Sequence, residues 1–102
     1  MTEFSQKIFD TIIKIPEGKV TTYGQVALIC GYKGAARAVG NTLHMNPAFG
    51  IIPCHRVVNS KGELAAAFVF GGKDVQKELL LKENIEFLDE YRVNMKKHFW
   101  IG

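Results

Sequence analysis

Cys54 is the side chain in this sequence whose setting best fits covalent chemistry, because Pro53 precedes it and His55 and Arg56 follow it. A cysteine reacts as the thiolate, and a neighbouring base or positive charge lowers the pKa of the thiol. Adjacent residues of a straight strand point to opposite faces, so His55 can assist Cys54 only where the backbone turns. A free cysteine is more often buried and inert, and both interpretations stay open at this point.

A second candidate site is a stretch of small residues around one arginine, Arg37, with Ala36 and Ala38 beside it and Gly40 after it. Close packing against another helix explains such a stretch without any ligand. The functional interpretation is entry into the minor groove of DNA, which is about 6 Å wide, whereas a helix with its side chains is about 10 Å across. A slim helix face helps that entry, and Arg37 would then reach the base stack. Tyr23, ahead of the same region, would press on a phosphate or simply lie at the edge of the core.

Two short helices are expected to position these groups. Helical spacing of hydrophobic residues predicts a first helix over about residues 3–14. Thr22 and Gln25 have the spacing of a capping box that opens a second helix, and Gly31 suits the C-terminus of that helix. A third helix is predicted over about residues 35–45. A glycine-rich turn between two short helices is typical of a helix-turn-helix, which we therefore expect here.

The pattern changes in the second half of the chain. Residues 51–58 are apolar with a polar insert, residues 59–62 form a turn signal, and residues 63–65 suit a returning strand, which together predict a small hairpin or wing. A further helix is predicted over residues 73–84. The tail over residues 85–102 carries too much apolar surface for a disordered end, so we expect it to dock on the body of the protein.

The composition is that of an ordinary globular protein, since the 102 residues are 47% hydrophobic and 23% charged, and one domain over residues 1–102 is expected. The 13 Lys and Arg against 10 Asp and Glu give a net charge of +3, a mild preference for nucleic acid. No apolar run is long enough to span a bilayer and no secretory pattern opens the chain, so we expect a cytoplasmic protein without a membrane partner. In that compartment the two cysteines favour free thiols over a disulfide, and their spacing does not suit zinc.

Residues 52–58, with the sequence Ile-Pro-Cys-His-Arg-Val-Val, resemble the active-site signature of the O6-alkylguanine-DNA alkyltransferases, also called methylated-DNA–protein-cysteine methyltransferases. Four further stretches resemble motifs of this family in the family's order: residues 22–25, 35–40, 46–47 and 59–62. The resemblance covers roughly residues 4–88, the extent of the family's DNA-binding and catalytic domain. It implies a mainly α fold, a winged-helix-like helix-turn-helix (a three-helical DNA-binding bundle) with a small β-hairpin and C-terminal helices.

The resemblance implies that Cys54 is the nucleophile that takes the alkyl group irreversibly. His55 would be the base that deprotonates this thiol through a water, and Glu83 would orient and charge-balance the imidazole, as in a triad. Asn46 would brace the turn that brings these groups together. No cofactor and no metal enter this reaction. Glu83 has an alternative interpretation, an exposed charge on the helix over residues 73–84.

The resemblance also implies a partner, double-stranded DNA that contains O6-alkylguanine and is bound through the minor groove. The O6 atom of a stacked guanine is out of reach, so the base must be flipped out of the duplex first. Arg37 would fill the gap that the base leaves, and Tyr23 would help to rotate its phosphate. Val57, Val58 and Phe68 would line the base pocket.

Two features depart from the pattern of the enzymes. Those proteins usually carry another domain before this one, whereas the length of this chain and its tail over residues 92–100 are similar to the short alkyltransferase-like proteins. Alkyltransferase-like proteins sense alkylated bases, carry tryptophan in place of the reactive cysteine and pass the lesion to other repair factors. The enzymes also have a hydroxyl-bearing pocket loop, whereas residues 66–72 offer Phe68 and no hydroxyl. Loss of one donor to O6 costs a few kcal/mol, which predicts slow transfer or a different preferred alkyl group.

The sequence thus predicts repair of O6-alkylguanine by stoichiometric transfer of the alkyl group to Cys54, by a protein that we expect to be monomeric. The alternative is a non-catalytic sensor that binds alkylated bases and signals to other DNA-repair proteins. A transcription factor that reads the major groove is disfavoured, because its recognition helix would carry several long polar side chains. Residues 35–42 are mostly Ala, Gly and Val instead.

Overall fold

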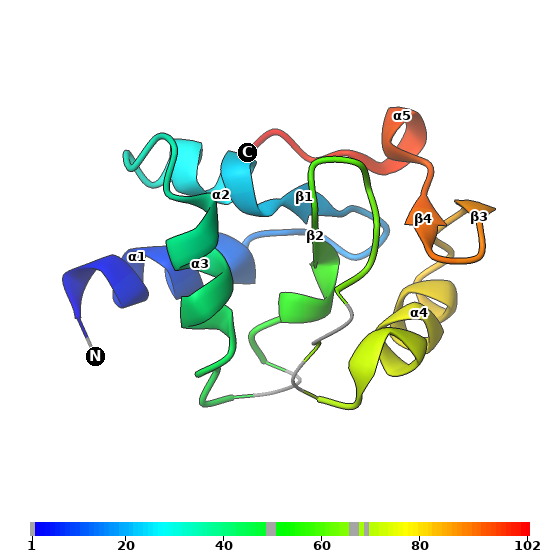
Figure 1. The fold of residues 1–102 in the computed structure, drawn as a ribbon, viewed down its shortest axis with the longest axis horizontal. Helices are drawn as coiled ribbons and strands as arrows, with labels where there is room; N and C mark the ends of the chain where they lie inside the picture. The colour runs from blue at the N-terminus through cyan, green and yellow to red at the C-terminus, as the bar shows by residue number, and fades with distance from the viewer. Residues whose placement is uncertain (1, 49–50, 66–67, 69) are drawn as a thin grey trace.

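Helices make up most of the regular structure of the protein, which was analysed as a computed structural model that describes residues 2–48, 51–65, 68 and 70–102 (Figure 1). The helices are α1 (Glu3–Ile13), α2 (Tyr23–Ile29), α3 (Ala36–Leu43), α4 (Gly72–Lys82) and α5 (Met95–His98), with a 3-10 helix, η1, at Cys54–Arg56. The strands are β1 (Thr21–Thr22), β2 (Val57–Val58), β3 (Phe87–Asp89) and β4 (Arg92–Val93). The predicted mainly helical fold with little sheet is confirmed.

The first three helices form the expected bundle around a helix-turn-helix (Figure 1). Thr22 caps α2, because its hydroxyl oxygen accepts a hydrogen bond from the Gln25 amide at 3.0 Å. Gly31 ends the same helix with a positive φ of 87°, and the Tyr32 amide donates to the Ala27 carbonyl at 2.8 Å, the pattern of a Schellman motif. These local signals were readable in the sequence, and both helix ends were predicted correctly.

The hydrophobic face of each helix in the bundle meets in one buried cluster. Ile8 and Ile12 of α1 are wholly buried there, together with Val26 of α2 and Val39 of α3. Cys54 belongs to the same cluster, so the segment that carries the candidate nucleophile packs against the core of the helix bundle.

A parallel pair of strands joins the helix bundle to the second half of the chain. Thr21 pairs with Val57 and Thr22 with Val58, which fixes the residues before α2 against the residues after η1. Figure 1 shows β1 and β2 side by side at the centre of the molecule. α3 lies to one side of them and α4 to the other. The register therefore holds the start of α2 next to the Cys54 turn.

The hairpin expected over residues 51–65 is not present, and this prediction was wrong. The turn itself forms, since the Gly62 amide donates to the Asn59 carbonyl at 2.9 Å, but the strands on either side of it find other partners. β2 pairs with β1, and Glu63 forms an isolated antiparallel bridge with Arg92. The antiparallel hairpin of the described residues is β3 with β4 instead.

The C-terminal tail docks on the body of the protein as predicted. The Val20 amide donates to the His98 carbonyl at 3.0 Å, and the Trp100 amide donates to the Val20 carbonyl at 2.8 Å. The Thr21 hydroxyl adds a hydrogen bond to the Trp100 carbonyl at 2.9 Å. Within the described part of the chain, no helix has the length and apolar character that crossing a membrane requires.

Candidate functional site

The turn that the chemistry of Cys54 requires is present. Residues Cys54–Arg56 form η1 directly after Pro53, so neighbouring side chains of this segment do not alternate as they would in a strand. The Cys54 side chain is only 4% exposed, and its sulfur accepts a hydrogen bond from Asn46 Nδ2 at 3.3 Å. The same Asn46 nitrogen donates to the Ile52 carbonyl at 3.0 Å, and its Oδ1 accepts from the Ala48 amide at 2.8 Å. Asn46 therefore braces the segment that carries the thiol.

Burial raises the pKa of the Cys54 thiol, and the hydrogen bond from Asn46 opposes this shift only in part. The neutral thiol is therefore the dominant form near neutral pH. Cys54 is therefore a poor nucleophile in this structure, because the thiolate is the reactive species.

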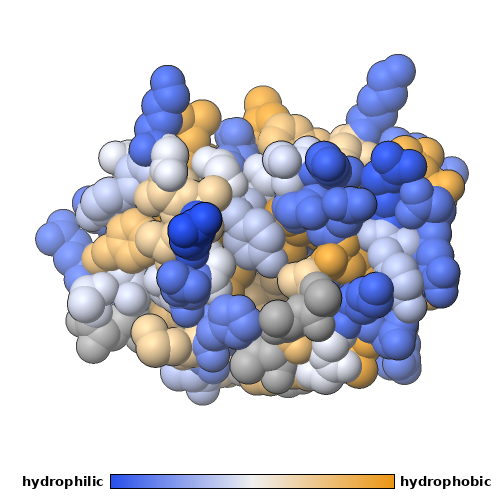
Figure 2. Space-filling view, in the orientation of Figure 1, coloured by the Kyte–Doolittle hydropathy of each residue, from blue (hydrophilic) through white to orange (hydrophobic). Residues whose placement is uncertain are grey.

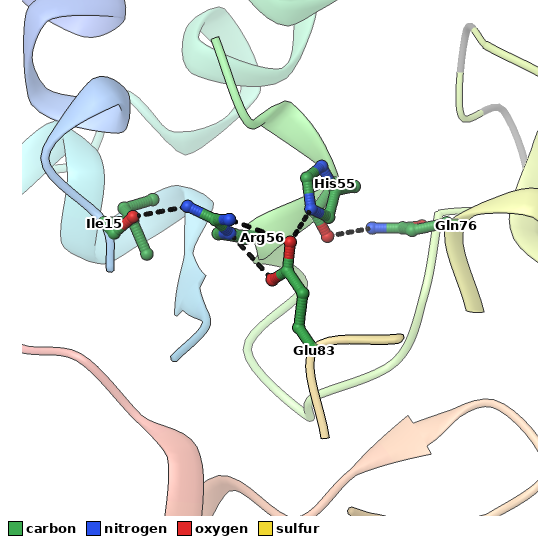
Figure 3. Close-up of polar contacts among 5 residues, drawn as sticks. All are labelled: Ile15, His55, Arg56, Gln76 and Glu83. Carbon is green, nitrogen blue, oxygen red and sulfur yellow. Dashed lines mark hydrogen bonds and ion pairs between the residues drawn. The ribbon is translucent and has the colours of Figure 1, made fainter. Parts of the chain in front are cut away.

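His55, Arg56 and Glu83 form one buried network (Figure 3). His55 Nε2 lies 2.8 Å from Glu83 Oε2, while Arg56 donates to both carboxylate oxygens, from Nε to Oε1 and from a terminal nitrogen to Oε2, each at 2.8 Å. The other terminal nitrogen of Arg56 donates to the Ile15 carbonyl at 2.8 Å. This arginine thus ties the turn after Cys54 to the end of α4 and to the loop after α1.

The network fixes the protonation of His55. Burial pushes the pKa of Glu83 upward, but the hydrogen bonds from Arg56 and His55 outweigh burial and hold its pKa below the ordinary value. Burial also lowers the pKa of His55, more than the contact with Glu83 raises it. A neutral imidazole beside an ionised carboxylate carries its proton on Nε2, so Nδ1 is the nitrogen left free to accept a proton.

A small cavity lies against the Cys54 side chain, between α3 and α4. Its volume of about 30 Å³ has room for only a few water molecules, so it does not admit a purine as it stands. Figure 2 shows hydrophobic surface recessed in this part of the molecule, with hydrophilic side chains on either side. The described residues that line the cavity are Tyr23, Gly40, Leu43, His44, Cys54, Ala65, Phe68 and Gln76.

Tyr23 and Phe68, predicted for DNA binding and for the base pocket, thus both lie on the wall of this cavity. Burial, followed by the charge that Cys54 would carry as a thiolate, raises the pKa of Tyr23, so its hydroxyl stays protonated and able to donate. Phe68 is 8% exposed and its ring meets that of Phe70 edge-on, with the centroids 5.8 Å apart. Residues 66, 67 and 69 of the predicted pocket loop lie outside the described residues.

α3 presents the small-residue face that the sequence indicated. Arg37 and Ala38 are exposed, Ala36 and Gly40 are half-buried, and Val39 points into the core. No hydrogen bond or ion pair joins Arg37 to another residue that the structure describes, so its guanidinium is available to a ligand. A Cβ at Gly40 would lie 3.9 Å from the Tyr23 ring, in ordinary van der Waals contact, so the space inside the protein does not require glycine there.

Val57 and Val58, predicted to contribute backbone and wall to the base pocket, point into the protein core in this structure, and their role at a bound base stays a prediction. Both side chains are wholly buried, Val57 in the core of the helix bundle and Val58 in a second cluster with Leu80 and Val93. Neither belongs to the described lining of the cavity. Their pairing with β1 turns them inward, which the sequence of residues 52–58 alone does not specify.

At α4, one expectation needs correction and one residue was missed. Glu83 does not lie within the helix but is its C-terminal cap, one residue after Lys82, and it is partly buried rather than an exposed charge. Gln76, which the sequence did not single out, is wholly buried and lies on the cavity wall. The available signal was its spacing of four residues from Leu80, because a polar residue on the apolar face of a helix needs buried partners.

No group of three or more His, Cys, Asp or Glu side chains suited to a metal ion occurs among the described residues. The groups that could do chemistry are therefore a thiol on the wall of a small cavity and, on the residue that follows it, an imidazole paired with a carboxylate. A helix that carries one free arginine lies on the other side of that cavity.

Residues 3–85 match the family described as "6-O-methylguanine DNA methyltransferase, DNA binding domain". Alkyltransferase-like protein 1 of Schizosaccharomyces pombe is 37% identical, over 98% of this chain and 96% of that protein. The DNA base-flipping protein of Vibrio parahaemolyticus is 38% identical, over 98% of both proteins. The methylated-DNA–protein-cysteine methyltransferase of Mycobacterium leprae is 41% identical, but the match covers 79% of this chain and 47% of the enzyme.

The fold has a similar counterpart among solved structures. The crystal structure of S. pombe Atl1 in complex with damaged DNA containing O6-carboxymethylguanine matches with a TM-score of 0.87 and 34% sequence identity. That match covers 98% of this chain and 96% of the other. The similarity therefore extends over both the helix bundle and the docked tail.

Proposed function

Because the chain belongs to the family of the 6-O-methylguanine DNA methyltransferase DNA-binding domain, we propose that it recognises alkylated guanine in duplex DNA. In this proposal the damaged base leaves the helix and enters the cavity beside Cys54. The observation that carries the proposal is that cavity, which lies between the free face of α3 and the buried turn of Cys54. The match over nearly full length with a protein crystallised on O6-carboxymethylguanine DNA supports it.

The proposed approach is from the minor groove. The exposed alanine of α3 keeps the helix slim, and Arg37 extends from it as the group that fills the place of the extruded base. Tyr23, at the start of α2, is half-buried at the edge of the cavity, where its hydroxyl could meet the phosphate of the rotated nucleotide. The protein would bind as a monomer.

Entry of a base requires the cavity to enlarge, because about 30 Å³ has room for only a few water molecules. Phe68 is a large side chain on the cavity wall that also packs in the buried cluster of the helix bundle, and it has no hydroxyl with which to bind O6. We propose that Phe68 moves and then stacks against the base. Recognition would then rest on shape and stacking more than on a hydrogen bond to O6.

Damage recognition without transfer is the function that we propose first. The sequence alone ranked transfer to Cys54 first, but the relatives matched over nearly their full length are an alkyltransferase-like protein and a base-flipping protein. The methyltransferase match covers 47% of the enzyme. The raised pKa of the Cys54 thiol and the missing hydroxyl on Phe68 also favour recognition over rapid chemistry.

Transfer to Cys54 is the second candidate, and the observation that favours it is a cysteine on the cavity wall where alkyltransferase-like proteins carry tryptophan. In this reaction the thiol proton passes through a water to Nδ1 of His55 and the sulfur attacks the alkyl carbon. The bond from that carbon to O6 breaks, and guanine takes up a proton as it leaves. The thioether on Cys54 does not hydrolyse, so each molecule would act once.

The test is intact mass and binding affinity after incubation with a duplex that contains one O6-methylguanine. A sensor binds this duplex more tightly than the same duplex with guanine, and its mass stays unchanged. A gain of one methyl group on the peptide that contains Cys54 would instead establish transfer. The Cys54→Ala variant is the matched control, because it cannot accept the group and keeps the rest of the site.

A further inference from the structure

Gln76 is a wholly buried polar side chain on α4, and it uses its whole amide group in hydrogen bonds to backbone. Its Nε2 donates to the carbonyl oxygens of His55 and Val57, each at 3.1 Å, and its Oε1 accepts from the Ala65 amide at 3.0 Å. Figure 3 shows the amide pointing from α4 toward the His55 carbonyl, with Gln76 on the side of His55 opposite Arg56. The side chain is 0% exposed, so these contacts do not compete with water.

The three partners of Gln76 belong to two segments that each contribute to the lining of the cavity. His55 and Val57 directly follow Cys54, which forms the Cys54 wall, while Ala65 itself lines the cavity and forms the Ala65 wall. A planar amide with three hydrogen bonds fixes both walls at once, since neither wall can move without breaking one of them. Loss of the amide would leave two carbonyls and one amide group buried without partners.

We propose that Gln76 is a positioning residue that sets the separation of the Cys54 wall from the Ala65 wall, and through it the preference for alkylated over unmodified guanine. This inference rests on the proposed function. A base in the cavity touches both walls together, so its binding depends on their separation. Contacts of α3 with DNA do not depend on it, because Gln76 makes no hydrogen bond to α3.

Gln76→Met tests the proposal, because methionine keeps the length of the side chain and removes all three hydrogen bonds. The measurement is the ratio of affinities for a duplex with O6-methylguanine and for the same duplex with guanine. We expect this ratio to fall about tenfold, since each lost hydrogen bond weakens an interaction several-fold. Affinity for the unmodified duplex should stay close to that of the wild type.

The ratio separates positioning from simple destabilisation. A variant that is merely less stable has a smaller folded fraction, which lowers both affinities alike and leaves the ratio unchanged. Thr21→Val is the matched control. Thr21 is also wholly buried and its hydroxyl donates a hydrogen bond to a backbone carbonyl, but it lies outside the described lining of the cavity. It should lose stability and keep the ratio of the wild type.

Gln76→Glu provides a second variant with a pH signature. An ionised carboxylate would face the carbonyl oxygens of His55 and Val57, whereas a protonated one donates to one of them and still accepts from Ala65. Burial among carbonyls raises the pKa of such a carboxyl group. The affinity ratio of Gln76→Glu, relative to wild type at each pH, should therefore recover between about pH 8 and about pH 6.

The outcomes distinguish the inference from the function on which it rests. If the wild type binds both duplexes equally, the proposed function fails and the inference fails with it. If the wild type prefers the damaged duplex but Gln76→Met keeps that preference, only the positioning role is overturned. Should Gln76→Met not fold, a pH-independent ratio in Gln76→Glu overturns the inference, and recovery at low pH supports it.

Discussion

Replacing Glu83 by glutamine should weaken the fold far more than the loss of one surface charge would. The Glu83 carboxylate accepts three hydrogen bonds of 2.8 Å, two from Arg56 and one from His55. The side chains of Glu83, Arg56 and His55 are only 11%, 16% and 10% exposed. Gln keeps one acceptor, but its NH2 group faces donors that it cannot satisfy. The arginine is then left buried without its counter-ion.

The expected loss follows from that burial. Breaking one partner of a buried ion pair costs about 3–5 kcal/mol, and Glu83→Gln falls near 3 kcal/mol because one acceptor remains. A domain of this size changes its Tm by about 4–8 °C per kcal/mol, which gives a decrease of about 12–24 °C. Urea unfolding and thermal unfolding followed by circular dichroism measure both quantities.

The same network predicts how stability depends on pH. The pKa of His55 is lowered in the folded state, so the unfolded chain binds its proton first and stability falls as the pH drops below about 6.5. The pKa of Glu83 is also lowered, so its contribution is present above about pH 4.3 and is lost as the pH falls further. The difference in stability between wild type and Glu83→Gln should therefore shrink in acid.

Glu86→Gln is the matched control for this prediction. Glu86 lies 3.6 Å from Lys97, but their side chains are 52% and 62% exposed, and such surface pairs contribute about 0–1 kcal/mol. A loss below about 1 kcal/mol for Glu83→Gln, or equal losses for the two variants, would refute the buried network as a source of stability.

Three further predictions concern α3, the turn at Gly62 and the thiol. Arg37→Ala should weaken binding to the damaged duplex from several-fold to about a hundredfold. The loss should be smaller on single-stranded DNA, where no base stack needs filling. Equal losses on both substrates, with a shallower salt dependence of binding, would make Arg37 a phosphate contact instead. Gly62→Ala should destabilise the protein by about 1–3 kcal/mol in urea unfolding, because φ is +82° and a Cβ would lie 3.0 Å from the Val93 carbonyl oxygen. Gly24→Ala is the control, because the space around Gly24 is open, and it should not lose stability. Cys54 should react with iodoacetamide more slowly at pH 7.5 than free cysteine does, as peptide mass spectrometry would show, and faster labelling would contradict a raised pKa.

The helix bundle could be predicted from the sequence because its signals are local. Thr22 and Gly31 mark the two ends of α2 within ten residues, and the apolar spacing of α1 needs no partner to be recognised. The motif around Cys54 was equally local, and it identified the segment that the structure places against the cavity. The brace from Asn46 and the partner at Glu83 came from the resemblance rather than from spacing.

The misplaced features depend on contacts between distant residues. A strand of two residues has no periodicity, so nothing in Val57–Val58 shows that Thr21–Thr22 is its neighbour. The wrong hairpin follows from that missing pairing, and so does the burial of Val57 in the core, which the sequence did not indicate. Gln76 was overlooked for a similar reason, because its partners at His55 and Ala65 are brought to it only by the fold.

The most direct test of the proposed recognition is the affinity of the wild-type protein for two duplexes that differ only at one base. One duplex carries O6-methylguanine and the other carries guanine at the same position, at the same salt concentration. We expect tighter binding to the damaged duplex, and a loss of that difference when Arg37→Ala removes the side chain that fills the stack. Equal affinity of the wild type for the two duplexes would contradict the proposed recognition.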